Sequence, residues 1–202
     1  MKVQTPFIAR LFYPSLLWKI DTASKEIFLT FDDGPHPEIT PKVLNILNHF
    51  NAKASFFCVG ENIFKFPDVF KEIVRQNHVT GNHTYNHLNG WKTENGEYFD
   101  NIEKCGEFLN TGLFRPPYGK IKPSQISYLK RKHKIVMWSV LSYDFSNKIS
   151  KERCFDIAVK NTVKGSIIVF HDSEKAARNM LYVLPRFLEH FSNLGYKFPV
   201  IL

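Results

Sequence analysis

The segment EIFLTFDDGP, residues 26–35, joins a run of β-branched and aromatic residues to a turn that carries two carboxylates. Residues 26–31 favour a strand, and Gly34 with Pro35 ends it because both residues favour turns. Similar short runs recur along the chain and predict six further strands, at residues 54–59, 78–80, 113–115, 135–138, 166–170 and 197–201.

Helix-length segments separate these strands. Pro67 opens a helix predicted over residues 68–76, Ser150 caps one over 151–162, and Thr40 with Pro41 marks another helix start. Further helices are expected over 97–109, 123–132 and 174–191. Strict alternation of strands and helices predicts an α/β fold with parallel strands, either doubly wound or closed into a barrel.

The composition of the 202-residue chain, 44% hydrophobic and 23% charged, is that of one globular domain. We expect residues 1–25 to form an N-terminal segment that packs on the barrel or leads into it, and residues 26–202 to form the domain.

Apolar residues recur at helix-like intervals before Trp18, Phe7 and Ile8 among them, and leave a weak peripheral membrane anchor as an alternative for this segment. Without a long apolar run or a cleavage site, we expect no transmembrane segment and a cytoplasmic or inner-face location, with the cell envelope as the alternative.

The net charge does not decide the partner, whereas the cysteines argue against two kinds of structural cross-link. The net charge of +8 fits an anionic partner or simple solubility, but no aromatic residues interleave the basic ones, so nucleic acid is not expected. Cys58, Cys105 and Cys154 form no C-x-x-C pair, which argues against a disulfide framework and a thiolate metal site. The sequence leaves the oligomeric state unknown.

Reactive side chains gather at the carboxyl ends of five predicted strands: Asp32, Asp33, His83, His87, Arg115, Asp144, His171 and Asp172. In parallel α/β folds the loops at this rim converge on the ligand, whereas the opposite rim serves stability. The clustering therefore predicts an enzyme whose active site lies at the carboxyl ends of the strands.

The spacing of His83 and His87 suits one cation, because a helical turn would set residues four apart on one face. Two histidines with a carboxylate form a common open site for Zn²⁺ or a similar ion, although such a pair is also ordinary on a helix surface. Asp32 and Asp33 are neighbours at a strand end and point to opposite sides, so one can ligate the ion while the other moves protons.

Five segments in order resemble the motifs of the polysaccharide deacetylase family, the NodB homology domain of carbohydrate esterase family 4. They are TFDDGP at 30–35, HTYNH at 83–87, RPPYG at 115–119, Asp144, and VFHD at 169–172. The resemblance runs from about residue 26 to the C-terminus. It implies a distorted (β/α)7 barrel of parallel strands, in agreement with the seven strands predicted above.

The resemblance also implies roles for single residues. Asp33, His83 and His87 would hold one divalent metal ion, Zn²⁺ first, with Co²⁺, Ni²⁺ or Mn²⁺ as alternatives. Asp32 would act as the general base and His171 as the general acid.

Supporting residues follow from the same resemblance. Arg115 would orient Asp32, or serve only as a structural ion-pair partner. Asp144, in preference to Asp172, would orient His171, and the backbone N–H of Tyr118 would stabilise the oxyanion. The resemblance places five residues at the substrate pocket: Pro116, Pro117, Trp138, Phe145 and Val169.

The chain departs from the family pattern at three wall positions. Phe145 stands where many members carry tryptophan, Leu141 where some carry aspartate, and Val169 where leucine is usual. These departures change the walls of the substrate pocket and leave the identity of the substrate open. The metal and proton-transfer residues match the family pattern.

The resemblance implies metal-dependent hydrolysis of N-acetyl groups from an amino-sugar glycan, a carbohydrate substrate that contains N-acetylglucosamine: a polysaccharide, peptidoglycan or a lipid-linked sugar. One alternative is an O-acetyl esterase acting on a polysaccharide such as xylan. Another is a catalytically silent carbohydrate-binding protein, which is disfavoured because every metal and proton-transfer position holds a competent residue.

Overall fold

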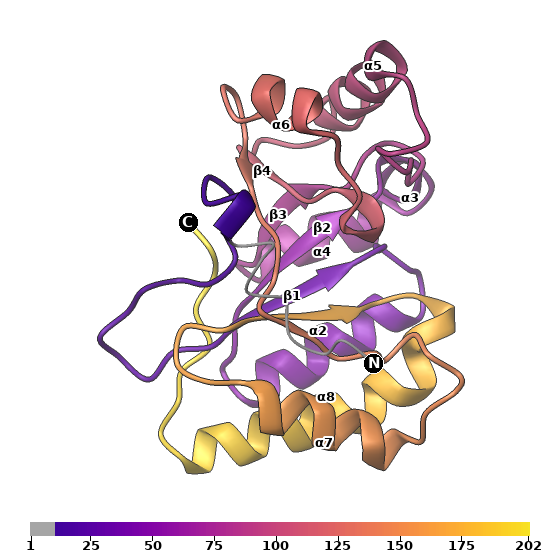
Figure 1. Cartoon of the computed structure of the whole chain (residues 1–202). Coiled ribbons are helices and arrows are strands. Elements are labelled where there is room, and N and C mark those ends of the chain that lie inside the picture. The colour runs from indigo at the N-terminus through magenta and orange to yellow at the C-terminus, as the bar shows by residue number, and fades with distance from the viewer. Residues whose placement is uncertain (1–10) are drawn as a thin grey trace.

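Seven parallel strands form one curled sheet in this computed structural model, which describes residues 11–202 (Figure 1). In chain order they are β1 (Phe28–Asp32), β2 (Ala54–Cys58), β3 (Val79–Asn82), β4 (Leu113–Phe114), β5 (Lys134–Ile135), β6 (Val140–Leu141) and β7 (Ile167–His171). Their order across the sheet is β5-β4-β3-β2-β1-β7-β6, so β5 and β6 form its two edges. The sheet is thus a half-barrel, open between β5 and β6, which confirms the predicted fold class.

Helices surround the sheet. The α-helices of the described residues after position 12 are α2 (Ile39–His49), α3 (Gly60–Lys65), α4 (Pro67–Arg75), α5 (Asn95–Gly106), α6 (Pro123–Leu129), α7 (Lys151–Asn161) and α8 (Glu174–Asn193). Helices α7 and α8 pack against each other, and α8 also contacts α2 and β7. Figure 1 shows these three helices along one side of the sheet and α5 and α6 on the other.

The alternation of side chains along β1 divides the interior into two layers. Leu29 and Phe31 belong to the cluster that α2 and α8 cover, whereas Phe28 packs with Phe57 and Ile167 in a separate cluster. Since side chains alternate along a strand, Thr30 and Asp32 share the face of Phe28. This pattern brings the carboxylate of Asp32 to the concave side of the sheet.

The seventh predicted strand is wrong. Residues 197–201 make one isolated bridge, between Lys197 and Glu26, although Phe198 and Ile201 are buried. Pro199 has no N–H to donate, so the segment cannot continue a hydrogen-bonded ladder. The remaining place in the sheet is taken by β6, which the sequence analysis did not predict.

Two helix predictions also need correction. Helix α3 was not expected, because Gly60 opens it and six residues give little periodicity. Helix α2 begins at Ile39, so Thr40 lies inside its first turn and does not cap it. The predicted starts at Pro67 and Ser150 are confirmed, and the Ser150 hydroxyl accepts the N–H of Arg153.

The described part of the N-terminal segment lies along the sheet. Leu17 forms a parallel bridge with Val136, and Lys19 forms an antiparallel bridge with Ser166. Residues 1–10, which include the Phe7 and Ile8 of the predicted membrane anchor, lie outside the described residues. Among the described helices, none combines the length and apolarity needed to cross a bilayer.

We expect Phe187→Ala to lower the free energy of unfolding by about 3–5 kcal/mol, because the fully buried ring leaves a cavity between α8 and the sheet. The Phe187 ring lies 5.8 Å from that of Phe170 and 4.7 Å from that of Phe191. Urea unfolding followed by circular dichroism measures the change. Phe64→Ala is the control, since Phe64 is 66% exposed, and equal losses in the two variants would contradict this packing.

Candidate active site

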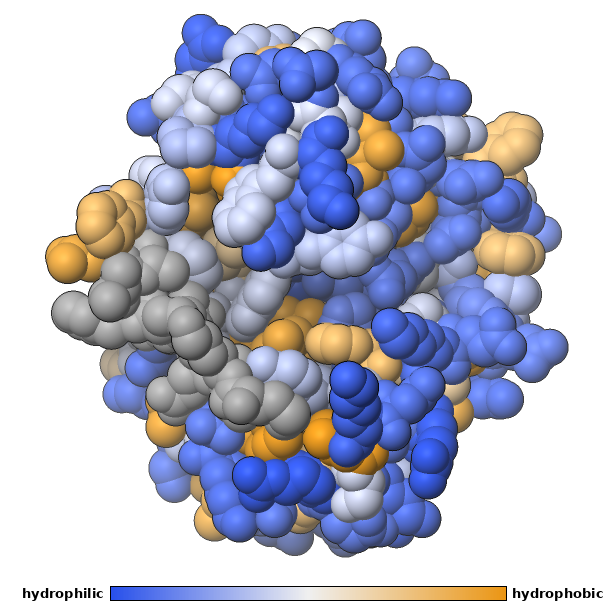
Figure 2. Space-filling model, turned by 45° about the vertical axis from the view of Figure 1, so that its right-hand side comes forward, coloured by the Kyte–Doolittle hydropathy of each residue, from blue (hydrophilic) through white to orange (hydrophobic). Residues whose placement is uncertain are grey.

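A cleft of about 610 Å³ opens at the carboxyl ends of the strands. Asp32, Asp33, His83, His87 and His171 all line it, so the structure brings together these predicted proton-transfer and metal-ligating side chains. Figure 2, which turns this side of the molecule toward the viewer, shows a hollow with apolar side chains inside and hydrophilic ones around it.

The backbone of the site adopts several left-handed conformations. Asp33 has a φ of 81°, and its carboxylate lines the same cleft as that of Asp32. Thr84 and His87 have φ values of 63° and 60°. Residues 83–88 form no helix, so the predicted helical turn is wrong, although the His83 and His87 rings do lie 5.1 Å apart. Two left-handed residues, rather than helical periodicity, bring the second imidazole back to the first.

Asp33, His83 and His87 could hold a metal ion. Asp33 Oδ1 lies 3.1 Å from His87 Nε2 and 3.8 Å from His83 Nε2, and all three ligand atoms fall within 4.8 Å of one another. One carboxylate and two imidazoles suit a divalent ion such as Zn²⁺ and leave coordination positions for water and substrate. The residues present therefore fit the metal that the resemblance implies.

The surroundings of these candidate ligands set their protonation states. Burial lowers the pKa of His83 to about 4, so its ring is neutral at neutral pH. His83 Nδ1 donates to the carbonyl of Arg115 at 2.7 Å, which leaves the lone pair of Nε2 facing the site. Burial acts to raise the pKa of Asp33, but the hydrogen bond from His87 and the charge of His171 hold it well below its ordinary value.

Arg115 is completely buried and holds Asp32. Its Nη1 donates to Asp32 Oδ1 at 2.7 Å and to the hydroxyl of Thr30 at 2.7 Å. The guanidinium also lies 4.1 Å from the centre of the Phe57 ring. Burial lowers the pKa of Arg115, but Asp32 opposes this shift and the guanidinium stays charged. The ion pair fixes the orientation of the Asp32 carboxylate toward the cleft.

Asp144 makes two contacts with His171. Its Oδ1 lies 2.7 Å from His171 Nδ1, and its Oδ2 accepts the His171 backbone N–H at 2.7 Å. Burial acts to lower the pKa of His171, but the Asp144 carboxylate outweighs it and raises the value to about 9. The imidazole is therefore protonated at neutral pH, and Nε2 is the nitrogen that Asp144 leaves unused.

Asp172 faces away from His171 and supports the loop of the first motif. Its Oδ1 accepts the N–H of Gly34 at 3.1 Å, and its Oδ2 accepts the Thr40 hydroxyl at 2.5 Å. A Cβ at Gly34 would lie 2.1 Å from Asp172 Oδ2, so the turn requires glycine. Burial raises the pKa of Asp172 to about 7, against the hydrogen bond from Thr40.

The remaining predicted pocket residues divide into two groups. Trp138, Phe145 and Val169 line the cleft together with Leu141, whereas Pro116 and Pro117 are buried and do not line it. The two prolines lead into the short 3₁₀ helix η1 (Pro117–Gly119).

Tyr118 borders the cleft through an unusual backbone conformation. It has a φ of 60°, and its ring lies 4.6 Å from that of His87. The Tyr118 hydroxyl is 3.1 Å from His87 Nδ1, so the motif loop contacts one of the candidate metal ligands.

Sequence reasoning missed one wall of the cleft, the first turn of α8 with the residue before it. Ser173, Glu174 and Lys175 line the cleft. Their position directly after the fifth motif, where a strand ends and a helix begins, was the signal that could have found them.

Comparison with known proteins gives one consistent result. The family model described as polysaccharide deacetylase matches residues 19–136. A peptidoglycan-N-acetylglucosamine deacetylase of Bacillus cereus is 41% identical over 155 residues, which are 73% of this chain and 56% of that protein's length. A second protein of the same name and organism is 30% identical over 192 residues, 91% of this chain and 90% of its own.

A solved structure is also similar to this chain. It is the Bc1960 peptidoglycan N-acetylglucosamine deacetylase in complex with a substituted N-oxidanyl-benzamide. The TM-score is 0.89 at 33% sequence identity, and the superposition covers 98% of this chain and 95% of that one.

We expect an NMR titration of the metal-free protein to give His171 a pKa near the value of about 9 that Asp144 imposes. In Asp144→Asn the pKa should fall, because burial is then opposed only by the charges of Asp33 and Asp32. Because the folded-state pKa of His171 is raised, its protonation stabilises the protein fully below pH 6.5. This contribution to the free energy of unfolding is lost as the pH rises through about 9. Urea unfolding measured between pH 6.5 and about 9 should show this loss of unfolding free energy in the wild type and not in the Asp144→Asn variant.

The exposed Asp156, which pairs with Lys160 at 3.3 Å, provides the matched control. Asp156→Asn should leave the His171 titration unchanged. A His171 midpoint that does not move in Asp144→Asn would contradict this account of the pair.

Proposed function

Because the chain belongs to the polysaccharide deacetylase family, we propose that it hydrolyses N-acetyl groups of a glycan that contains N-acetylglucosamine, with peptidoglycan as the first candidate. The named relatives support this substrate. One observation carries the reaction: the Asp33, His83 and His87 donor set shares a cleft with the carboxylate of Asp32 and the imidazole of His171. Peptidoglycan lies outside the cytoplasmic membrane, so this substrate favours the cell envelope over the cytoplasm.

Asp33, His83 and His87 are the proposed metal ligands, and Zn²⁺ is the first candidate. A divalent ion bound there would supply Lewis acidity, which makes water a nucleophile near neutral pH and polarises an amide carbonyl. The same nitrogen and oxygen donors also accept Co²⁺, Ni²⁺ or Mn²⁺. The neutral state of His83 and the ionised state of Asp33 are those that ligation requires.

Asp32 is the proposed general base. Arg115 holds the carboxylate at 2.7 Å, so Asp32 keeps its position while it accepts a proton from the attacking water. The backbone N–H of Tyr118 is the proposed donor to the oxyanion, because the motif loop that carries it lies at the cleft beside His87.

His171 is the proposed general acid. Its Nδ1 is bound to Asp144, so Nε2 is left to donate a proton to the departing amine. An amine is a poor leaving group unless it is protonated, and the raised pKa of His171 keeps the proton available at neutral pH.

Apolar side chains form the proposed acetyl pocket. Trp138, Leu141, Phe145 and Val169 line the cleft beside His171, where a methyl group would be removed from water. Pro116 and Pro117 are assigned the supporting role of holding the loop that presents Tyr118.

We expect acetate release from N-acetylglucosamine oligomers to stop with a chelator and to return when Zn²⁺ or Co²⁺ is added, because the donor set holds an exchangeable divalent ion. Parallel assays on O-acetylated xylan oligomers separate the amidase from the esterase. Faster release from the ester alone would favour the esterase. Oligosaccharide binding without release, across Zn²⁺, Co²⁺, Ni²⁺ and Mn²⁺, would contradict the proposed hydrolysis.

We expect Asp32→Asn to lower kcat by about 10²- to 10⁴-fold, the range for loss of a general base, while the protein still binds its metal ion. Metal content measured by elemental analysis gives the second readout. Asp68→Asn is the matched control, because that side chain is 91% exposed on α4 and far in sequence from every motif. An active Asp32→Asn variant with bound metal would overturn the base assignment.

A further inference from the structure

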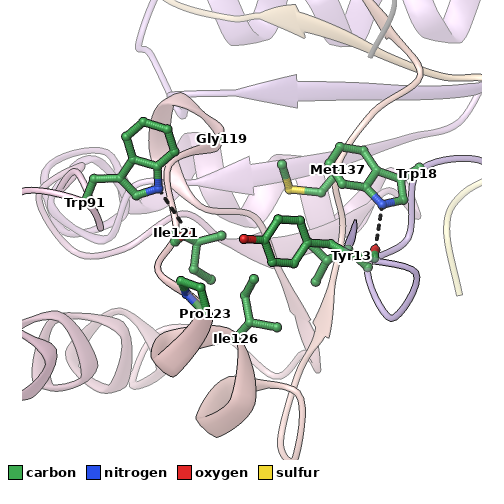
Figure 3. A pocket seen from close by; sticks show the side chains of 9 residues that line it. Tyr13, Trp18, Trp91, Gly119, Ile121, Pro123, Ile126 and Met137 are labelled. Atoms are coloured by element: carbon green, nitrogen blue, oxygen red, sulfur yellow. Dashed lines mark hydrogen bonds between the residues drawn. The ribbon is translucent and has the colours of Figure 1, made fainter. Parts of the chain in front are cut away.

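A second pocket, of about 310 Å³, lies beside the catalytic cleft and shares one residue with it. Gly119 lines both cavities. The second pocket is otherwise formed by the described N-terminal segment, the loop before α5, α6 with the residues before it, and Met137 between β5 and β6 (Figure 3). Its volume is at the lower end of the range of small-ligand sites.

A thin wall separates the two cavities. Met137 lines the second pocket, and the next residue, Trp138, lines the catalytic cleft. Gly119 has a φ of 65°, and a Cβ there would lie 2.6 Å from Cη2 of Trp138. Glycine therefore lets the loop pass close to the Trp138 ring, so that the two cavities adjoin with no side chain of residue 119 between them.

Three aromatic residues shape the second pocket. Figure 3 shows Trp91 and Trp18 at opposite ends with Tyr13 between them. The Trp18 indole N–H donates to the Tyr13 carbonyl at 3.0 Å, and the Trp91 indole N–H donates to the Ile121 carbonyl at 3.0 Å. Because the protein itself uses both indole donors, the rings are held in place and present mainly apolar surface to a ligand.

The electrostatics of the pocket favour a neutral ligand with an apolar face. None of the nine residues that line it carries a formal charge. Trp91 is 58% exposed, and the ammonium group of Lys120 lies 3.7 Å from the centre of its ring. This cation fixes one exposed ring at the edge of the pocket without placing a charge in the lining.

We propose that this pocket is a subsite for a further sugar ring of the same glycan, one that lies along the chain from the ring being deacetylated. The proposal rests on the proposed function. A polymeric substrate must leave the catalytic cleft on some path, and the aromatic pocket adjoins that cleft at Gly119, which lines both cavities. A neutral pyranose fits it, because its C–H faces are apolar and its hydroxyl groups project at the edges, where they remain in water.

The test measures binding by full-length Asp32→Asn protein loaded with Zn²⁺, in which turnover is suppressed. Isothermal titration with a disaccharide and a pentasaccharide of N-acetylglucosamine should show tighter binding of the longer ligand. Adding Trp91→Ala should weaken pentasaccharide binding about tenfold, as expected for loss of an aromatic anchor, and leave disaccharide binding within twofold. Trp91→Phe should restore most of the loss because it keeps an aromatic face.

Phe64→Ala is the matched control, since Phe64 is an aromatic residue on α3 that is 66% exposed and does not line either cavity. Equal affinities for the two oligosaccharides, or equal losses for both in the Trp91→Ala protein, would overturn the subsite. Acetate release by the wild type is measured separately. If that release fails while the length-dependent affinity remains, the proposed function is wrong and the subsite stands.

Discussion

The guanidinium of Arg115 connects parts of the half-barrel that strand pairing leaves apart. It donates to Thr30 and Asp32 on β1. It also donates to the backbone carbonyls of Val136 and Met137, in the segment that runs from β5 to β6. A buried cation is tolerated only where a counter-charge and hydrogen bonds replace its hydration, and Asp32 is that counter-charge. Asp32, the proposed base, therefore also serves as the counter-charge that the buried guanidinium requires. The Arg115 hydrogen bonds that connect β1 with the segment between β5 and β6 also fix the orientation of the Asp32 carboxylate.

Backbone strain accompanies this rigid frame where the motif loops enter the cleft. Asp33, Thr84, His87 and Tyr118 all have φ values between 60° and 81°, a conformation that non-glycine residues adopt at a cost of about 1–3 kcal/mol each. Hydrogen bonds offset part of this cost: the Thr84 N–H donates to the Asn82 side chain at 2.9 Å. These backbone conformations direct side chains into the cleft that an extended chain would direct elsewhere. The positions of the motif side chains therefore depend on the local backbone conformation.

The same features explain what the sequence could and could not predict. Hydrophobic runs predicted the strands of the sheet that are buried on both faces, such as β1 and β7, because burial alone determines their composition. Residues 197–201 form a similar run but make only one isolated bridge, because Pro199 has no N–H to donate. The hydrophobic pattern does not reveal this effect of a single residue. The approach of His87 to His83 depends on two left-handed residues, which periodicity does not reveal. Motif order, in contrast, identified side chains that the fold brings to one cleft.

His83 and His171 illustrate how the position of a side chain in the cleft determines its chemistry. Burial alone lowers the pKa of each, and for His83 nothing outweighs it, so the pKa is about 4 and the ring keeps a lone pair for a cation. For His171 the Asp144 carboxylate at 2.7 Å outweighs burial, so the pKa is about 9 and the ring keeps its proton. Environments that move two pKa values in opposite directions separate a ligand from an acid. The proposed metal ligand and the proposed acid can therefore share one cleft at the same pH.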